Sequence, residues 1–209
     1  MRAERQSALA IGQMNETAVG AAVSAEEDGG VRRVAVLGAE CTGKSQLCQA
    51  IALTLPGITF TEVLREWVLI EGRPPNAEEQ FQLFARQQEV EAQAVIEARH
   101  AGYRWVICDS APLMTAVYSL HYFSDDRLIE AAVAHHMGYA QTILCADDIA
   151  WVPDPGQRDG EAVRKAVQAQ LIKVLDRHCP QTVLIEGFGR ARLDRALEAL
   201  AGERSVQPT

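Results

Sequence analysis

The sequence predicts an α/β fold of the P-loop NTPase class, with a central five-stranded parallel sheet, helices on both faces and a mobile lid. Two observations predict this fold. Five short apolar runs alternate with stretches of helical periodicity, an order typical of parallel sheets, whose strands are joined by crossover helices. The first apolar run ends in GAECTGKS, residues 38–45, which fits the pattern G-x-x-x-x-G-K-[ST] of a phosphate-binding loop.

Each expected strand is a short apolar run that is closed by a glycine or by polar residues. The runs cover residues 32–38, 57–63, 103–110, 141–147 and 181–187. Apolar residues recur every four positions through residues 43–55, and this spacing predicts a helix directly after the glycine-rich loop. A long helix, whole or with one break, is expected over residues 77–101, and a last helix over residues 193–201.

The length of 209 residues allows one good core and not two large ones. Residues 1–30 are rich in Ala, Glu, Gly and Ser without a sustained period, so we expect a disordered tail there; the alternative is an upstream start codon that adds nothing to function. Residues 31–209 form the one expected domain. We expect a cytoplasmic protein, because no stretch approaches 18 uncharged apolar residues and the N-terminus lacks a signal peptide's apolar centre.

The composition argues against several kinds of partner. The net charge is −8 and the pI is about 5.2, whereas phosphate backbones and anionic membranes favour clustered Lys and Arg. We therefore expect neither nucleic acid nor a membrane as a partner. The five cysteines include no C-x-x-C pair, which argues against a zinc site and against a disulfide framework.

The glycine-rich loop predicts a site for ATP and Mg²⁺. Its glycines let the backbone curl so that N–H groups point at phosphate oxygens, and the following helix adds a positive end. Lys44 can reach the β- and γ-phosphates, and the Ser45 hydroxyl can ligate Mg²⁺. The alternative is an ordinary strand-to-helix turn with an exposed lysine. The expected nucleotide contacts are Gly38, Glu40, Cys41, Thr42, Gly43, Lys44, Ser45 and Gln46.

Features of other P-loop classes are missing from the sequence. The guanine motif N-K-x-D of GTPases is absent, and CADD ends the fourth expected strand instead. An apolar strand ending in Asp-Glu, typical of motor ATPases, is also absent, and the chain is too short for the extra helical domain of a ring ATPase. These absences favour a small-molecule kinase.

Two carboxylates are expected at the ligand-binding edge of the sheet. Glu62 follows the second strand, with Arg65 about one turn later, and ligands of such sheets bind outside the carboxyl ends of the strands. Glu62 can take a proton from an acceptor hydroxyl or hold a ribose; the alternative is a surface pair with Arg65. Asp109 ends the third strand, expected beside the first, and can hold Mg²⁺ or orient the acceptor; the alternative is a helix N-cap.

Residues 148–166 predict the lid, because they combine two prolines, two glycines and alternating charges. Arg158, Arg164 and Lys165 are candidates to close over the transferred phosphoryl group, and Arg158 is favoured because it lies in the flexible part. The alternative is a solvated loop. Trp151 can stack on a ring of the acceptor or anchor the lid in the core.

Two further segments are weaker candidates. Gly187 and Arg190 follow the fifth strand, where a turn of P-loop kinases often wraps the adenine. His135 and His136 suggest a metal, but adjacent positions on a helix point about 100° apart and do not share a ligand.

Together these segments resemble the ribosylnicotinamide kinase domain of bifunctional NAD-salvage proteins, within a wider family often labelled AAA-type ATPases. The resemblance covers residues 32–200 and depends on GAECTGKS, TEVLREW, ICDSA, ILCADDIAWVPDPGQRDG and VLIEGFGRARLDRALE, in that order. It implies transfer of phosphate from ATP, with Mg²⁺, to the 5′-hydroxyl of nicotinamide riboside. The matched positions are Lys44 and Ser45 in the loop, Glu62, Arg65 and Asp109 after the strands, and Arg158 in the lid.

The chain departs from the family's pattern at one position of the site. The family's third strand tends to end in D-T-D, whereas Ala111 stands here in place of the second acid, so the acceptor is open. Neither an adenylyltransferase H-x-G-H motif nor an N-terminal DNA-binding domain is found. Besides the nucleoside kinase, a regulatory module that hydrolyses ATP slowly stays open. A polynucleotide-end kinase is disfavoured by the acidic balance.

Overall fold

The computed structural model describes residues 30–152 and 160–202. The elements are β1 (Arg32–Leu37), α1 (Lys44–Thr54), β2 (Gly57–Thr59), α2 (Val63–Glu71), α3 (Glu79–His100), β3 (Trp105–Asp109), α4 (Pro112–Phe123), α5 (Ile129–His136), β4 (Gln141–Cys145), α6 (Glu161–His178), β5 (Val183–Ile185) and α7 (Gly189–Gly202). The expected N-terminal tail and the centre of the expected lid, including Arg158, lie outside the described residues.

The five strands form one parallel sheet in the order β2-β3-β1-β4-β5, as predicted. The expectation that the third strand lies beside the first is confirmed, since Val34 of β1 faces Ile107 of β3. The chain first fills the side of β2 and β3 and then crosses to β4 and β5. The loop after β1 therefore emerges at the centre of the sheet, where such folds bind their ligands.

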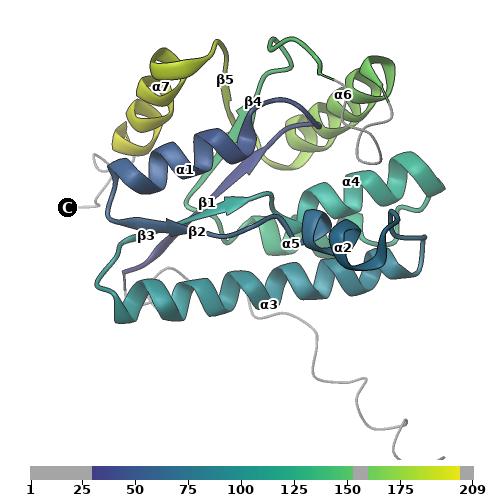
Figure 1. Ribbon diagram of the computed structural model, residues 1–209, viewed down its shortest axis with the longest axis horizontal. Coiled ribbons are helices and arrows are strands. Elements are labelled where there is room, and N and C mark those ends of the chain that lie inside the picture. Colours follow the sequence, from purple (N-terminus) through teal and green to yellow (C-terminus); the bar gives the residue numbers. More distant parts are fainter. Residues whose placement is uncertain (1–29, 153–159, 203–209) are drawn as a thin grey trace, which may run out of the picture.

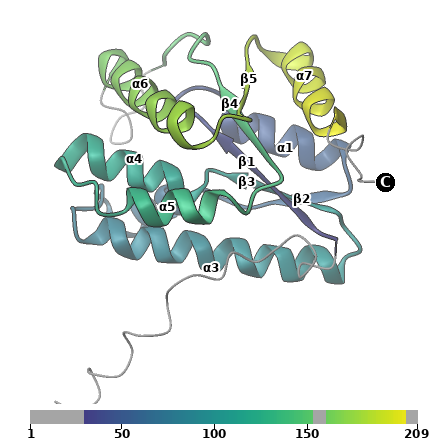
Figure 2. The ribbon, with the colours of Figure 1, turned by 180° about the vertical axis from the view of Figure 1, so that it is seen from behind.

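Helices cover both faces of the sheet, and the alternation of side chains along β1 shows how. Val34 and Val36 join the apolar core beneath α1 and α7, whereas Ala35 and Leu37 join the core formed with α4 and α6. Figures 1 and 2 show α1 and α7 on one side of the sheet and α3, α4 and α5 on the other. Because both faces are covered, the central strands read as continuous apolar runs.

The second strand is shorter than predicted, and the prediction of residues 57–63 was wrong at its carboxyl end. The strand ends at Thr59, and Val63 already begins α2 with Glu62 at the N-cap position. The apolar residues beyond Thr59 therefore do not continue the ladder with β3, which stops at the pair Thr59–Ile107.

The helix predicted over residues 77–101 is α3, which runs without a break from Glu79 to His100. It contains neither Gly nor Pro and is rich in Ala, Glu, Gln and Arg, all strong helix formers. No helix in residues 30–152 or 160–202 combines the length and apolar character needed to cross a membrane.

Candidate functional site

The loop between β1 and α1 requires glycine at two positions. A Cβ on Gly38 would lie 2.7 Å from the Thr42 Oγ1 and 3.0 Å from the Cys145 carbonyl oxygen, so this position admits no side chain. Gly43 has a φ of 76°, and Cys41 a φ of 55°, both in the left-handed region. A backbone with left-handed residues of this kind is typical of loops whose N–H groups bind an anion.

Both backbone polar groups of Ala39 make hydrogen bonds that fix the shape of the loop. Its carbonyl oxygen accepts hydrogen bonds from the Thr42 hydroxyl at 2.8 Å and from the Lys44 ammonium at 2.9 Å. Its N–H donates to the Gln168 Oε1 at 2.8 Å, and the Gln168 amide donates in turn to the Cys145 carbonyl at 2.9 Å. Lys44 is only 7% exposed, which does not fit the alternative of an ordinary turn with an exposed lysine.

The structure places Lys44 and Asp109, at the carboxyl ends of β1 and β3, close enough to Glu62 for their charges to act on its carboxyl group. Burial raises the pKa of the half-buried Glu62 carboxyl, and the neighbouring Lys44 ammonium opposes that rise. The Asp109 carboxylate raises the pKa of Glu62 further, whereas the exposed Arg65 lowers it. Within the described residues no ion pair joins Arg65 to Glu62, so a surface pair between the two is not formed.

Asp109 is buried and lacks a hydrogen-bond partner for one oxygen. The side chain is 5% exposed, and its Oδ1 has no partner among the residues that the structure describes. It does not cap α4, because Ala111 occupies the N-cap position and no side chain bonds there. The free carboxylate oxygen of Asp109 and the half-exposed hydroxyl of Ser45 are the hard oxygen ligands that Mg²⁺ prefers, so these residues fit the ion.

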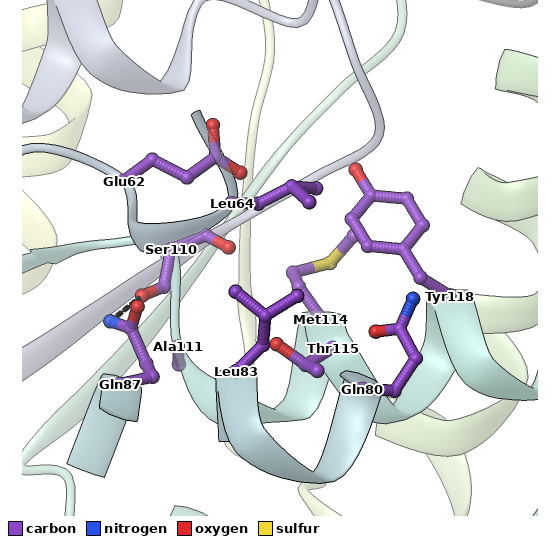
Figure 3. A pocket seen from close by; sticks show the side chains of 10 residues that line it. All are labelled: Glu62, Leu64, Gln80, Leu83, Gln87, Ser110, Ala111, Met114, Thr115 and Tyr118. Carbon is purple, nitrogen blue, oxygen red and sulfur yellow. Dashed lines mark hydrogen bonds between the residues drawn. The ribbon is translucent and has the colours of Figure 1, made fainter. Parts of the chain in front are cut away.

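A narrow pocket, which we call the α3–α4 pocket, opens beside this crevice. Figure 3 shows Glu62, Ser110 and Gln87 at one end, and Gln80 beside Tyr118 at the other. Burial raises the pKa of the Tyr118 hydroxyl well above its ordinary value, with a further rise from Glu62. The α3–α4 pocket is lined by Glu62, Leu64, Gln80, Leu83, Gln87, Ser110, Ala111, Met114, Thr115 and Tyr118.

The sequence reasoning missed the contribution of α3 and α4 to this pocket. The available signal was the spacing of Gln80 and Gln87, which are seven residues apart and enclose the apolar pair Leu83 and Phe84. Seven residues are about two helical turns, so both glutamines lie on the buried face of α3.

A second hollow, the α1–α7 cavity, lies on the opposite side of the loop and has a volume of about 360 Å³. Its walls are mainly apolar, and Phe188 projects there with 81% of its surface exposed. Such a cavity beside a phosphate-binding loop has the shape and chemistry to hold an aromatic base. It is lined by Gly43, Gln46, Leu47, Ala50, Ile149, Phe188, Gly189, Arg190, Arg192 and Leu193.

The predicted Gly187 and Arg190 both lie near this cavity, in different roles. The Gly187 N–H donates to the Asp148 carboxylate at 2.5 Å, which fixes the turn after β5. Arg190 lines the cavity, is exposed, and pairs with Asp194 at 2.8 Å.

Arg192 was not singled out by the sequence reasoning, although it lies deeper in the structure. It is 4% exposed and donates to three carbonyl oxygens, those of Gly187 at 3.0 Å and of Ala146 and Ile185 at 3.3 Å. This guanidinium joins the ends of β4 and β5 and forms part of the cavity wall beside Gly43. The positive charge of Arg192 in the sequence did not indicate that its guanidinium would bind backbone carbonyl oxygens.

The described part of the predicted lid packs against the phosphate-binding loop. The Trp151 indole donates to the Glu40 carboxylate at 3.3 Å. Arg164 is 2% exposed and donates to the carbonyl oxygens of Cys41, Ile149 and Asp147, at 3.4, 2.9 and 2.9 Å. Arg164 is therefore held by the backbone and ties the segment after β4 to the loop.

Three other candidate residues, one of the lid and two of α5, have partners outside the phosphate-binding loop. Lys165 is exposed and pairs with Glu161 at 2.9 Å. His135 and His136 point to different partners, as the helical geometry predicted: His135 lies 3.0 Å from Glu91 and His136 lies 2.8 Å from the Thr142 hydroxyl. No group of three His, Cys, Asp or Glu residues suited to a metal ion occurs in the described part of the chain.

Comparisons with solved structures agree with this fold. The chain is similar to a structure described as NadR protein in complex with NR, with a TM-score of 0.70, 18% identity, and coverage of 87% of this chain and 54% of that chain. NadR in complex with NAD and AMP-PNP gives a TM-score of 0.67, 16% identity, and coverage of 87% and 52%. The chain thus spans about half the length of the NadR chains.

A third similar structure is a deoxyadenosine kinase from M. mycoides with bound dCTP. Its TM-score is 0.52 at 11% identity, and the match covers 81% of this chain and 99% of that chain. Among curated protein sequences, none matches this chain. The model of the AAA_28 family, described as an AAA domain, matches residues 33–192, more than half of the sequence. Together with the P-loop fold, this match shows that the chain belongs to the AAA_28 family of AAA domains.

Proposed function

We propose that the protein transfers the γ-phosphoryl group of ATP to the 5′-hydroxyl of a nucleoside. The observation that carries the proposal is the proximity of Lys44 and Asp109 to Glu62, with Glu62 lining the α3–α4 pocket and Gly43, next to Lys44, lining the α1–α7 cavity. The α1–α7 cavity has a volume of about 360 Å³ and the α3–α4 pocket one of about 10 Å³, so the proposal requires the α3–α4 pocket to widen when the acceptor binds beside the loop. A simple hydrolase has no need for the second hollow.

In the proposed complex the adenine occupies the α1–α7 cavity, near Gln46, Phe188 and Arg190. The triphosphate follows the loop, whose N–H groups and helix N-terminus favour negative charge. The Lys44 ammonium leaves the Ala39 carbonyl and neutralises the charge that develops on the β- and γ-phosphates.

The acceptor enters the α3–α4 pocket with its hydroxyl toward Glu62. A carboxyl in this half-buried place, whose pKa is raised, is a better proton acceptor than an ordinary surface carboxylate. Ser45 and Asp109 would hold Mg²⁺, which supplies charge neutralisation at the phosphates when it is bound. Arg158 of the lid remains our proposed cation for closure, and Trp151 and Arg65 remain proposed acceptor contacts.

We propose nicotinamide riboside as the first acceptor to test, which would give nicotinamide mononucleotide for NAD biosynthesis. The similar NadR structure holds NR, and the similar deoxyadenosine kinase holds dCTP, so nucleoside-like ligands recur among the structural neighbours. Because Ala111 stands where the family has an acid, Glu62 is the one carboxylate that lines the α3–α4 pocket among the described residues. Neutral nucleosides should therefore be tested as acceptors together with nicotinamide riboside. The five free cysteines fit a reducing cytoplasm as the location.

The test measures ATP consumption by the purified protein with Mg²⁺, alone and with each member of a nucleoside panel. Strong stimulation by one nucleoside supports the proposal. A basal rate that no nucleoside changes would instead favour the regulatory ATPase, for which the loss of the acid at Ala111 is the motivating observation.

A further inference from the structure

The α3–α4 pocket contains two glutamines that are almost completely buried. Gln80 and Gln87 are each 4% exposed, and both line the pocket from the same face of α3. Neither amide has an atom that is both fully enclosed and without a partner, so the unbonded polar atoms of both side chains reach the open space of the pocket. The hydrogen bonds of the two side chains differ and indicate two different roles.

Gln87 has a fixed orientation. Its Nε2 donates to the Ser110 carbonyl oxygen at 2.6 Å and to the Glu91 carboxylate at 3.3 Å. Both partners are acceptors, so the amide nitrogen must face them, and the Oε1 is left as an acceptor without a partner among the described residues. At this end the pocket is therefore lined by the side-chain carbonyl oxygen of Gln87, next to Glu62 and Ser110 (Figure 3).

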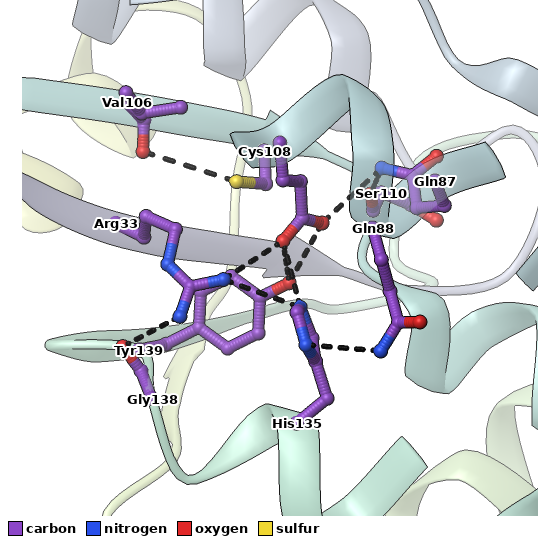
Figure 4. Close-up of polar contacts among 10 residues, drawn as sticks. Arg33, Gln87, Gln88, Val106, Cys108, Ser110, His135, Gly138 and Tyr139 are labelled. Carbon is purple, nitrogen blue, oxygen red and sulfur yellow. Dashed lines mark hydrogen bonds and ion pairs between the residues drawn. The ribbon is translucent and has the colours of Figure 1, made fainter. Parts of the chain in front are cut away.

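Glu91 is itself held in place by a buried network, and its partners Arg33, His135 and Tyr139 are labelled in Figure 4. It is 0% exposed and accepts from the Tyr139 hydroxyl at 2.6 and 2.7 Å, from Arg33 at 3.2 Å, and lies 3.0 Å from the His135 ring nitrogen. With its carboxylate surrounded by donors, Glu91 has one orientation. The direction of the Gln87 amide is consequently determined by the fold and not by the ligand.

Gln80 is different, because its side chain has no hydrogen bond to any described residue. It keeps both a donor and an acceptor, and Figure 3 shows it beside Thr115 and Tyr118, at the end of the pocket away from Ser110. The rise of 1.5 Å per residue places Gln80 about 10 Å along α3 from Gln87. That separation is close to the length of a nucleoside.

We propose that Gln80 determines acceptor specificity by pairing with a donor–acceptor edge of the base, while Gln87 accepts a hydrogen bond from a ribose hydroxyl. A primary carboxamide and the amino–nitrogen edge of adenine or cytosine both offer that pattern, because each sets an N–H donor beside an acceptor. A carboxylate in the same place offers only acceptors. This inference rests on the proposed function, since it assigns the base end and the sugar end of the same pocket.

The test compares Gln80→Leu with the matched control Gln82→Leu, which changes an exposed glutamine on the same helix. For the nucleoside that wild type prefers, Gln80→Leu should raise KM about ten- to hundredfold, with little change in kcat or in the KM for ATP. Discrimination between a base carboxamide and its carboxylate analogue, or between adenosine and unsubstituted purine riboside, should shrink. Gln82→Leu should match wild type, and unchanged discrimination in Gln80→Leu would overturn the proposal.

Thermal unfolding separates recognition from a structural role. Because Gln80 has no hydrogen-bond partner among the described residues, Gln80→Leu should melt at or above the wild-type temperature without ligand. A large loss of melting temperature would show that Gln80 stabilises the fold and would contradict our inference.

The role of Gln87 is tested with sugar analogues. Wild type should prefer a ribonucleoside over its 2′- or 3′-deoxy analogue, and Gln87→Leu should lose that preference. An equal preference in both proteins would contradict a hydrogen bond from the ribose to Gln87.

Calorimetry keeps this inference separable from the proposed function. Nucleosides are titrated into wild type and Gln80→Leu, each saturated with Mg²⁺ and a non-hydrolysable ATP analogue. Binding to wild type that Gln80→Leu weakens supports base recognition even where no transfer occurs, and the kinase proposal alone then fails. Transfer with unaltered nucleoside binding in Gln80→Leu overturns the inference alone, and no nucleoside binding to wild type overturns both.

Discussion

Gln168 of α6 holds the backbone N–H of Ala39 in the phosphate-binding loop through a buried hydrogen bond of 2.8 Å. The other end of the same amide donates to the Cys145 carbonyl at the end of β4, at 2.9 Å. One side chain thus connects the loop to a strand that is not its own. The shape of the loop depends on this connection as well as on the glycines in its sequence.

Replacing Gln168 by Leu should therefore destabilise the protein and weaken nucleotide binding together. The change leaves the Ala39 N–H and the Cys145 carbonyl buried without a partner, which costs about 1–3 kcal/mol. Chemical unfolding and ATP titration measure the two effects. Gln170→Leu is the matched control, because the one side-chain partner of Gln170 in the described part of the chain is the partly buried His121. An equal effect of the two changes would contradict the assignment.

Replacing Lys44 by Met should abolish most phosphoryl transfer while leaving the fold intact. The ammonium is expected to neutralise charge that develops in the transition state, and loss of one such group lowers kcat by about 10²–10³-fold. The cost to the fold is small, because the Ala39 carbonyl keeps the Thr42 hydroxyl as a donor. Steady-state kinetics and circular dichroism check both parts, and full activity in Lys44→Met would contradict the proposed site.

Activity should rise with pH as Glu62 loses its proton. Burial and the neighbouring Asp109 carboxylate raise the pKa of Glu62, although Lys44 opposes them, so the midpoint should lie above the ordinary value of 4.5. The pH profile of kcat/KM for the acceptor measures it. Glu62→Gln, which cannot titrate, should be slow at all pH values and should lack this ionisation.

The same raised pKa has a consequence for stability with a definite sign. A carboxyl whose pKa is higher in the folded state contributes its full stability below the unfolded pKa and loses it as the pH rises through the folded pKa. Without ligand, wild type should therefore lose stability relative to Glu62→Gln between about pH 4.5 and the raised folded pKa. Parallel pH dependences in the two proteins would show that Glu62 does not have a raised pKa.

His136 should make the fold sensitive to acid. Burial, together with the neighbouring charges of His135 and Arg33, lowers its pKa from 6.5 to about 4. The unfolded chain takes up the proton first, so stability is present above pH 6.5 and is lost as the pH falls from there toward 4. By pH 5 the loss should be roughly 2 kcal/mol.

Unfolding curves at pH 7 and pH 5 test this expectation. The variant His136→Gln keeps an amide donor for the Thr142 hydroxyl but does not titrate. It should lose less stability than wild type over the same interval. An equal loss would place the acid sensitivity elsewhere in the protein.

Arg192 and Arg190 should differ sharply although both line the α1–α7 cavity. Arg192→Ala removes one donor from each of three carbonyl oxygens, of which only that of Ile185 keeps another, the Ala146 N–H, among the described contacts, and it should cost roughly 2–4 kcal/mol of unfolding free energy. Arg190 is exposed and, within residues 30–152 and 160–202, pairs with Asp194 alone, so Arg190→Ala should cost less than about 0.5 kcal/mol. Equal effects on stability would contradict the structural role given to Arg192.

The sequence was sufficient for the sheet and the phosphate-binding loop, because both have local signals. Apolar runs, glycines and the alternation of strands with helices are short-range patterns, and they predicted five parallel strands and the neighbours β1 and β3. The end of β2 was not predictable from such a pattern. An apolar stretch through Glu62 suits a strand, and only the packing of α2 decides that the helix begins at Val63.

The roles of the buried polar residues could not be predicted in the same way. Arg164 and Arg192 have the charge expected of phosphate ligands, but tertiary contacts commit both to backbone carbonyls. Gln80 and Gln87 belong to a residue type common on exposed helix faces, and they lie at the pocket only because α3 packs beside β3 and α4. The catalytic assignments of Lys44 and its neighbours therefore stay predictions that kinetics must test.

The most direct test of the account follows the terminal phosphate of ATP. The protein is incubated with Mg²⁺, γ-labelled ATP and the nucleoside that stimulates ATP consumption most, and the products are separated. The account predicts that the label appears on the 5′-oxygen of the nucleoside with wild type and is nearly absent with Lys44→Met. Label found entirely in inorganic phosphate, whichever nucleoside is supplied, would contradict the proposed kinase and leave an ATPase.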